Sequence, residues 1–600
     1  MSARTGFITL TAMALLAGEA RAAKPDASPA AGCAPARWGR ALVADDPVAK
    51  GLHRLLTRYA QHGFSGAILL VNNGRPQLNQ GYGWADAEAG IASRPNTLYD
   101  VASLAKTFTA AAILDLESRG KLKTSDKLSD FIPGIPADKA EITLHQILTH
   151  TAGFRWELSD IGVTAEDSTE DFLRKALTAD LVHPPGGAYR YTNVGYGLLA
   201  LVIQKVSGQT WQAYVRERLI KRANLRDTFV YGDTLPKNRV LARGYMGPTE
   251  EEATLQPRFT ANANSPLIWG KHPVGAVGIL TSAPDLQRWW CALNGTILPP
   301  EQRLKMFTIQ AANQGYGWNI RQENGVTTRI SRGGSRQPFI SQLTYYPQQS
   351  GLLALVTNKF VQGVWPQRVL SNVDRALGGE PYFIPPAIAP VPETALRQHV
   401  GSYVLEGGGK LNIRLASGLL HVGAEGASAV EPFVYPAGGT PSYLRQLEGT
   451  SELVVRALSR GDFKEAGRLG SVKPEQLARL ETSWSGWMKE TGGFQGVEVL
   501  GSTPGAEGNT RVFLRLQGPA GQKVFRFLIK PGSQEILAWG DDVALPFHSR
   551  LLPQSHTEFA TFDFDTGRTV TLRFDKAGNV EVAPPGGVPV LRATRAGAAR

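Results

Sequence analysis

Ser103-Leu-Ala-Lys106 opens a stretch that is predicted to be helical as far as about Arg119. Apolar residues recur there at helical spacing and Gly120 is a natural stop. Because an α-helix turns once per 3.6 residues, residues three apart lie on one face, which brings the lysine amine within reach of the serine hydroxyl. A free serine hydroxyl is a poor nucleophile at neutral pH, and a neutral lysine can take its proton. The alternative reading of Ser103 and Lys106 is an ordinary helix start with a lysine that reaches to solvent.

Further blocks surround this stretch in a fixed order along roughly residues 45–378. They are Phe64-Ser-Gly-Ala-Ile-Leu-Leu-Val, Gln80-Gly-Tyr-Gly-Trp, Thr97-Leu-Tyr-Asp-Val-Ala-Ser103, Ile147-Leu-Thr-His-Thr-Ala-Gly-Phe154, Tyr191-Thr-Asn193 and Gly278-Ile-Leu-Thr-Ser-Ala-Pro-Asp285. Together they resemble the serine β-lactamase-like family, on the side of class C β-lactamases and penicillin-binding-protein-like esterases. The resemblance implies an α+β domain in which an antiparallel sheet is flanked by helices and joined by a helical region.

The resemblance also implies roles for individual residues. Ser103 would be the acylated nucleophile and Lys106 a proton acceptor. Tyr191 would be the general base and later the acid, and Asn193 would orient the carbonyl side of the substrate. Since these two residues lie two apart, an extended stretch points both side chains the same way. The alternative is that the tyrosines of this region serve only as packing.

The third element of the family site is usually Lys-Thr-Gly or His-x-Gly, and this chain departs from it. Its best match is Arg332-Gly333-Gly334, followed by Ser335. Arginine keeps the positive charge but does not shuttle protons, because its pKa stays far above neutral. It can instead lower the pKa of Tyr191 or hold a substrate carboxylate. Gly333 supplies no hydroxyl for a β-lactam carboxylate, which argues against an efficient β-lactamase. The backbone N–H groups of Ser103 and Ser335 are the expected oxyanion hole.

Other kinds of active site find no support in the sequence. There is no Gly-x-Ser-x-Gly, so a nucleophile-elbow hydrolase is not expected. His145 and His150 are five apart and lack the His-Glu-x-x-His pattern of a zinc site, and the resemblance makes their segment structural. No phosphate-binding glycine loop is present either. We expect no metal and no cofactor.

Composition and the first residues bear on location and partners. A positive Arg4, an apolar stretch and Ala20-Arg21-Ala22 predict a signal peptide over residues 1–22, and therefore a periplasmic or secreted protein. Cys33 and Cys291 are the only cysteines, and the sequence leaves open whether they pair. The net charge of +12 is carried by scattered Lys and Arg without a dense run, so a solvated basic surface is expected and not nucleic-acid binding. No segment predicts a stable membrane span, and the oligomeric state stays open.

At 600 residues the chain is too long for one hydrophobic core. We predict the hydrolase domain over residues 45–378 and a proline-rich linker over 379–393. Short meandering strands then predict β-rich C-terminal modules. Residues 394–435 and 541–600 are interpreted as one split, lipocalin-like β-barrel. Residues 436–540 are interpreted as an inserted α+β unit of cystatin-like type.

The sequence therefore predicts an exported serine hydrolase that forms an acyl-enzyme on small esters or amides, D-amino-acid peptides among them. Two alternatives remain open. One is a true β-lactamase. The other is a catalytically silent sensor or interaction protein, in which residues 390–600 make the contacts.

Overall fold

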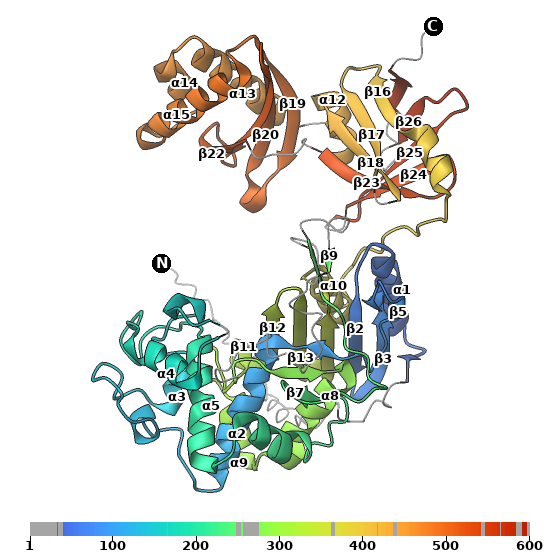
Figure 1. Cartoon of the computed structure of the whole chain (residues 1–600). Helices are drawn as coiled ribbons and strands as arrows, with labels where there is room; N and C mark the ends of the chain where they lie inside the picture. Colours follow the sequence, from blue (N-terminus) through green and yellow to red (C-terminus); the bar gives the residue numbers. More distant parts are fainter. Residues whose placement is uncertain are drawn as a thin grey trace, which may run out of the picture.

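The computed structural model describes residues 33, 40–164, 166–247, 254–255, 275–361, 367–416, 418–435, 441–541, 547–563, 566–583 and 591–596. Figure 1 shows three bodies: a large α+β body, a β-barrel above it, and a smaller α+β unit beside the barrel. The signal peptide predicted over residues 1–22 lies outside the described residues.

The large body is built around an antiparallel sheet with the strand order β1-β3-β2-β14-β13-β12-β11. The strands are β1 (Leu42–Val43), β2 (Gly66–Asn72), β3 (Arg75–Tyr82), β11 (Asn319–Glu323), β12 (Val326–Arg336), β13 (Phe339–Tyr346) and β14 (Gly351–Thr357). Gly66 of β2 pairs with Thr357 of β14, so the two ends of this body share one sheet.

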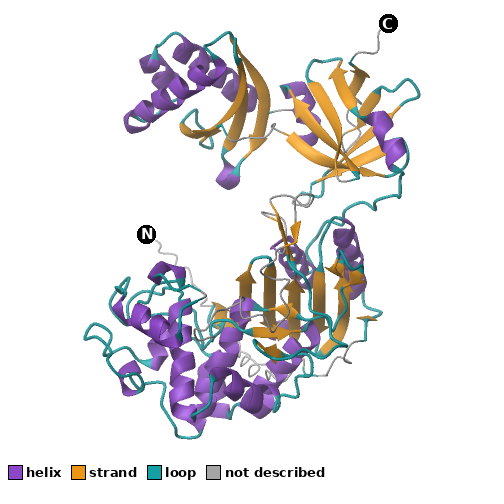
Figure 2. Ribbon diagram, viewed as in Figure 1, coloured by secondary structure: helices purple, strands orange, loops and turns teal. Residues whose placement is uncertain are grey.

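Helices cover both faces of this sheet, which explains why β2 is an unbroken apolar run and not an alternating one. Ile68 and Leu70 pack with α1 (Pro47–Gln61) and α10 (Gln367–Gly378) on one face. Leu69 and Val71 join the main core on the other face. That core includes the helices α2 (Lys106–Ser118), α3 (Leu144–Leu148), α4 (Thr169–Thr178), α5 (Asn193–Ser207), α8 (Ala283–Ala292) and α9 (Pro300–Phe307), which Figure 2 shows in purple below and beside the sheet.

Helix α2 runs through the middle of this core, and every residue from Lys106 to Leu116 is buried. The predicted start of this helix at Ser103 is wrong in detail. Ser103 lies on a 3₁₀ turn, η1 (Ala102–Ala105), and α2 begins at Lys106. The reason is local: Ala102 has a left-handed backbone with φ of +47°, which breaks α-helical continuity just ahead of the serine.

Beyond the large body, two stretches of chain close into one β-barrel (Figure 1). Its strands are β16 (Gly401–Leu405), β17 (Lys410–Ala416), β18 (Leu419–Glu425), β23 (Phe547–Pro553), β24 (Glu558–Phe562), β25 (Thr569–Phe574), β26 (Val580–Ala583) and β27 (Leu591–Arg595). Pairing of β18 with β23 and of β16 with β27 joins the two stretches. The barrel has its own core, which includes Tyr403, Leu411 and Phe559.

The chain between β18 and β23 forms the small α+β unit. Helix α12 (Ala427–Val434) was not expected and connects the barrel to it. The unit contains α13 (Ser442–Ser459), α14 (Phe463–Leu469), α15 (Pro474–Thr491) and a sheet of β19 (Gly496–Pro504), β20 (Thr510–Gly518), β21 (Gly521–Ile529) and β22 (Ile536–Gly540). In Figure 1 its three helices lie on the face of the sheet that points away from the barrel. The α+β class and the β-rich C-terminal region are confirmed, whereas the limits of independently folding domains stay a prediction.

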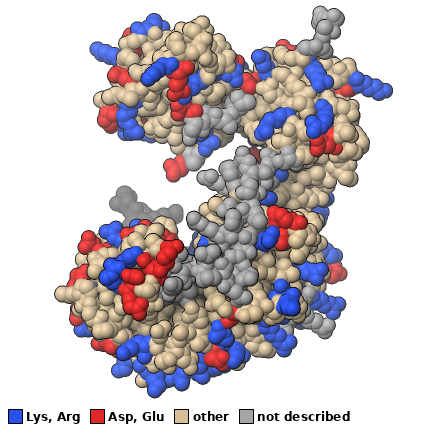
Figure 3. All heavy atoms as spheres, in the orientation of Figure 1, with Lys and Arg blue, Asp and Glu red and all other residues tan. Residues whose placement is uncertain are grey.

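The surface agrees with the scattered charge of the sequence. On the face that Figure 3 shows, Lys and Arg are interspersed with Asp and Glu. None of the described helices combines the length and the apolar character that crossing a bilayer requires.

Candidate active site

Ser103 is held on a strained turn. The N–H of Ala102 donates to Asp100 Oδ1 at 2.8 Å, and Asp100 also pairs with Arg336 at 3.2 Å and accepts a hydrogen bond from Tyr231. A left-handed backbone at a non-glycine residue costs about 1–2 kcal/mol, so the surrounding contacts must fix it. Asp100 ends strand β6 (Tyr99–Asp100) and Arg336 ends β12, so the serine turn is held between the two strands.

Lys106 is the first residue of α2, three residues after Ser103, and is fully buried. Its Nζ donates to Ser103 Oγ at 3.1 Å, to Asn193 Oδ1 at 2.6 Å and to the Ala276 carbonyl oxygen at 2.9 Å. An ammonium group has three N–H donors, and all three have an acceptor here. The amine therefore bridges the nucleophile, the start of α5 and the segment that precedes β10 (Ile279–Thr281).

Tyr191 reaches Ser103 from the loop before α5. Its Oη donates to Ser103 Oγ at 2.7 Å. Its ring lies 4.6 Å from that of His150, whose Nδ1 accepts the Thr192 N–H at 3.1 Å. Thr192 is the N-cap of α5, and Asn193 is the first residue of that helix. The start of α5 therefore fixes Tyr191 and Asn193 together. Both side chains face the turn that carries Ser103 and Lys106.

Arg332 approaches from β12 and is buried with 3% of its surface exposed. Its Nη2 donates to Tyr191 Oη at 3.1 Å and its Nε donates to the Ser103 carbonyl oxygen at 3.2 Å. The strand runs so close to the serine turn that a Cβ at Gly334 would lie 2.1 Å from the Val101 carbonyl oxygen. Glycine at this position is thus a steric requirement. The next residue, Ser335, is exposed beside the turn.

Gly333 lies opposite Gln342 of β13, and a Cβ there would lie 2.8 Å from Gln342 Oε1. The glutamine side chain thus occupies the space next to the position where the family usually carries threonine.

The pKa values of Lys106, Tyr191 and His150 are linked, because the same nearby charges shift them. Burial lowers the pKa of Lys106 to about 8, helped by Arg332 and opposed by Tyr191 and Glu157. Burial alone would raise the pKa of Tyr191, but the positive charges of Lys106 and Arg332 outweigh it and lower this pKa to about 8. Burial, with the same two cations, holds the pKa of His150 well below 6.5, so the ring beneath Tyr191 is neutral. Near physiological pH a fraction of Tyr191 is therefore deprotonated and can accept a proton from Ser103.

The structure brings together Ser103, Lys106, Tyr191, Asn193 and Arg332, and sets Gly334 and Ser335 alongside them. Sequence reasoning missed Glu157, whose Oε2 accepts a hydrogen bond from Asn193 Nδ2 at 2.7 Å. It also missed the Asp100–Arg336 pair. Neither has a spacing signal, since Glu157 lies 36 residues before Asn193 and Arg336 lies 236 residues after Asp100.

Within the described residues, no group of three or more His, Cys, Asp or Glu side chains is arranged to hold a metal ion. Cys33 and Cys291 form a disulfide bond that ties residue 33 to α8.

A family model described as β-lactamase matches residues 45–368. The chain is 25% identical over 419 residues to penicillin-binding protein 4* of Bacillus subtilis (strain 168), an alignment that covers 66% of this chain and 91% of the relative. It is 32% identical over 260 residues to the putative penicillin-binding protein PbpX of the same organism, covering 43% of this chain and 62% of that relative.

Among solved structures, the octameric penicillin-binding protein homologue from Pyrococcus abyssi matches with a TM-score of 0.50. The match covers 92% of this chain and 100% of that chain at 17% identity. At this identity the likeness concerns the fold, and it extends beyond the large body into the C-terminal region.

Proposed function

The chain belongs to the β-lactamase family of serine hydrolases, and from that premise we propose that it is an active hydrolase that cleaves small esters or amides through an acyl-enzyme on Ser103. One observation carries the proposal. Ser103 Oγ lies within hydrogen-bond distance of both Tyr191 Oη and Lys106 Nζ, at 2.7 and 3.1 Å, although Tyr191 is 88 residues away. A nucleophile that contacts a base with a lowered pKa is the arrangement that covalent catalysis needs.

In the first half-reaction, deprotonated Tyr191 takes the Ser103 proton while Oγ attacks the substrate carbonyl carbon. Lys106 and Arg332 stabilise the negative charge on Tyr191 before the transfer, since they flank its ring at 4.9 and 5.3 Å. The oxyanion that forms is directed to the N–H groups of Ser103 and Ser335. Tyr191 then returns its proton to the leaving group, and the same tyrosine activates the water that releases the acyl group.

The Arg332-Gly333-Gly334 segment of β12 favours esters and amides over β-lactams as substrates. Arg332 contributes charge but carries no proton, and Gly333 has no hydroxyl. Gln342 fills the space beside Gly333. We therefore propose turnover of small esters or peptide-like amides, and slow or absent hydrolysis of penicillin.

Export to the periplasm or secretion remains part of the proposal. It is supported by the Cys33–Cys291 bond, because disulfides form and persist in oxidising compartments.

The test combines intact mass and kinetics. We expect a fluorophosphonate to add once, on Ser103, and Ser103→Ala to abolish both the adduct and turnover of a p-nitrophenyl ester. Lys106→Ala and Tyr191→Phe should lower turnover by about two orders of magnitude or more, because each removes a proton-transfer partner.

The outcomes separate the alternatives. Full turnover in Ser103→Ala would overturn the mechanism. Absence of any adduct and of any turnover would support the silent interaction protein, and rapid penicillin hydrolysis would identify a β-lactamase.

A further inference from the structure

One buried carboxylate connects the serine turn with strand β12. Asp100 Oδ1 accepts the N–H of Ala102 at 2.8 Å, on the turn that carries Ser103. The other oxygen, Oδ2, accepts from Nη1 of Arg336, the last residue of β12, at 3.2 Å. Because each oxygen of the carboxylate serves a different element, a shift of either element must stretch or break one of these contacts.

A tyrosine joins this connection from a third element. Tyr231 follows β7 (Phe229–Val230), and its Oη donates to Asp100 Oδ2 and accepts from Arg336 Nη1 at 2.9 Å. The three side chains therefore contact one another in a closed ring. The Arg336 side chain is 21% exposed and that of Asp100 6%, so water screens the two charges only weakly. Removal of either charged partner leaves the other buried, which is costly.

Backbone contact limits how closely β12 approaches the turn. A Cβ at Gly334 would lie 2.1 Å from the Val101 carbonyl oxygen and 3.0 Å from the Ser103 backbone nitrogen. The strand therefore packs against the turn without room for a side chain at this point. Repulsion prevents a closer approach, and the pair of Asp100 and Arg336, two positions farther along the strand, opposes a wider one. The separation of turn and strand is fixed from both directions.

This separation bears on the chemistry because the two expected oxyanion donors lie on the two elements. The N–H of Ser103 belongs to the turn, and the N–H of Ser335 belongs to β12, next to Arg336. Both N–H groups must come within about 2.7–3.1 Å of the oxygen that becomes negative in the tetrahedral intermediate. A small displacement of one element lengthens one of these hydrogen bonds at the step where it contributes most.

The direction of the Ser103 N–H depends on the residue before it. Ala102 has a φ of +47°, and the peptide unit that follows it carries the N–H of Ser103. Two other contacts of the turn hold carbonyl oxygens: Arg332 Nε donates to that of Ser103 at 3.2 Å, and Ser341 Oγ to that of Val101 at 2.8 Å. The buried carboxylate instead holds the left-handed residue itself, through its N–H.

We propose that Asp100 and Arg336 are positioning residues that hold the two oxyanion-binding N–H groups, those of Ser103 and Ser335, at a fixed separation. This inference rests on the proposed function and deepens it, because it assigns the geometry of the oxyanion hole to an ion pair outside the proton-transfer groups. Loss of the pair should slow acyl transfer without changing which groups carry the proton.

The first test is kinetic. Asp100→Asn keeps an oxygen for the Ala102 N–H but loses the charge that holds Arg336, and Arg336→Gln loses the charge on the other side. Each should lower kcat for p-nitrophenyl acetate by about 10- to 100-fold, less than the roughly 10²–10³-fold loss on removal of a whole donor, with KM within about twofold. Arg336→Lys keeps the charge and should recover part of the loss. The double variant should be no slower than the slower single variant, because both changes remove the same link.

Two controls separate positioning from a merely structural effect. Rates are expressed per fluorophosphonate-labelled Ser103, so that a smaller folded fraction does not count as a slower enzyme. Asp374→Asn breaks an ion pair with Arg329 near the opposite end of β12, and it should leave kcat unchanged even where it lowers the melting temperature.

The pH profile gives a further readout. The charges that lower the pKa of Tyr191 are those of Lys106 and Arg332, so the midpoint near pH 8 should be the same in the wild type, Asp100→Asn and Arg336→Gln.

A boronic acid measures the oxyanion hole apart from turnover. Phenylboronic acid adds to Ser103 Oγ as a tetrahedral anion, which resembles the intermediate, and the serine proton passes to Tyr191. Calorimetry should show its Kd rising by about the same 10- to 100-fold in Asp100→Asn and in Arg336→Gln, and by less than about twofold in Asp374→Asn.

Unchanged kcat and Kd in Asp100→Asn and Arg336→Gln would overturn the inference, as would losses that multiply in the double variant or a displaced pH midpoint. If Asp100→Asn does not fold, the two Arg336 variants decide by the same criteria. Wild-type turnover with unaffected variants would leave the proposed hydrolase intact. Absence of both turnover and fluorophosphonate adduct in the wild type would contradict the hydrolase itself, and this role with it.

Discussion

Arg332 shows at the scale of one residue how this site departs from its family. A guanidinium cannot take a proton at neutral pH, so it contributes charge and hydrogen bonds alone. It contacts Tyr191 Oη at 3.1 Å and lowers the pKa of both Tyr191 and Lys106. The pKa of Tyr191, the proposed base, is therefore lowered by a residue that takes no part in proton transfer.

This role predicts a shift in the pH profile. Because Tyr191 must be deprotonated to act, kcat/KM for a p-nitrophenyl ester should rise with pH through a midpoint of about 8. Arg332→Gln removes a charge that stabilises the phenolate and disfavours the ammonium of Lys106, so the midpoint should move up by about one unit. Arg332→Lys keeps the charge and should move it less. The profiles are measured between about pH 6 and 10, with Ser103→Ala as the background for spontaneous hydrolysis. An unchanged midpoint in Arg332→Gln would show that the arginine does not tune the base.

Spacing explains which site residues the sequence could reveal. Ser103 and Lys106 lie three apart, and Tyr191 and Asn193 lie two apart, so each pair has a local pattern. Glu157 is joined to Asn193 only by the way that two loops meet, and a single sequence holds no signal for such a contact.

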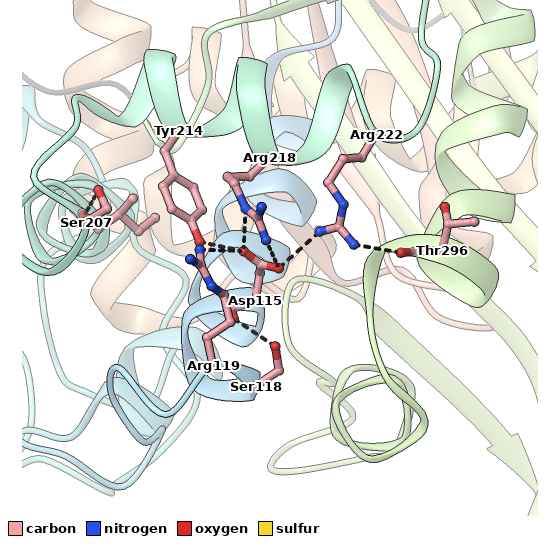
Figure 4. Close-up of polar contacts among 9 residues, drawn as sticks. Asp115, Ser118, Arg119, Ser207, Tyr214, Arg218, Arg222 and Thr296 are labelled. Carbon is pink, nitrogen blue, oxygen red and sulfur yellow. Dashed lines mark hydrogen bonds and ion pairs between the residues drawn. The ribbon is translucent and has the colours of Figure 1, made fainter.

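At the scale of elements, α2 is anchored at its far end by one buried carboxylate (Figure 4). Asp115 has 4% of its side chain exposed and pairs with Arg222 at 3.2 Å, with Arg218 at 3.3 Å and with Arg119 at 3.8 Å. It also accepts a hydrogen bond from Tyr214 at 2.6 Å. Figure 4 shows these side chains converging from α2, from the helical segment formed by α6 (Trp211–Tyr214) and η4 (Val215–Ile220), and from the turn after it, which carries Arg222. The cluster fixes the helix whose other end carries Lys106 of the candidate active site.

Asp115→Asn should therefore destabilise the protein without altering chemistry. Removing the single carboxylate leaves three guanidinium groups facing one another, at a cost of about 2–3 kcal/mol. This cost is below that of the fully buried case because the arginine side chains are 34–44% exposed. Calorimetry should record a lower melting temperature, while ester kcat/KM at 25 °C stays within about twofold. Arg119→Gln is the control: its ion pair is the longest and most exposed of the three, so it should cost under about 1 kcal/mol. Equal effects of the two changes would contradict the anchoring role of Asp115.

Among the elements, the long apolar runs were predictable and the special turns were not. Strands β13 and β14 follow directly from two apolar stretches separated by Pro347-Gln-Gln-Ser350. The left-handed Ala102 could not be predicted, because its conformation depends on Asp100 and on β12, which is more than 200 residues away.

At the scale of the whole molecule, the proline-rich segment between the large body and the barrel is packed and not loose. Ile388 N donates to Gln61 Oε1 of α1, whereas Ala389 N donates to the Pro553 carbonyl oxygen of the barrel. Tyr382 and Ile384 join the core beneath α1. Composition correctly marks this segment as irregular, but it cannot show that both neighbours bind it.

His62, at the end of α1, lies at this junction and reports on it. Burial lowers its pKa to about 3, helped by the charges of Arg550 and Arg58 and opposed by the Pro386 backbone. Arg550 Nη2 of the barrel donates to His62 Nδ1 at 3.3 Å, which requires the neutral ring. Since a free histidine has a pKa near 6.5, the docked barrel favours the deprotonated form, and protonation favours separation.

Docking of the barrel should consequently weaken in acid. The contribution of His62 is complete above pH 6.5 and declines as the pH falls from there towards about 3. Small-angle scattering should give a larger radius of gyration at about pH 4.5 than at pH 7, and His62→Gln, which stays neutral, should reduce that difference. Imidazole NMR of the full chain should place the titration of His62 well below pH 6.5. Arg550→Gln should raise the His62 pKa only in part, because burial is the larger cause and the segment around Pro386 still covers the ring. Titration of His62 near 6.5 in the intact protein would mean that the barrel does not rest on α1 in solution.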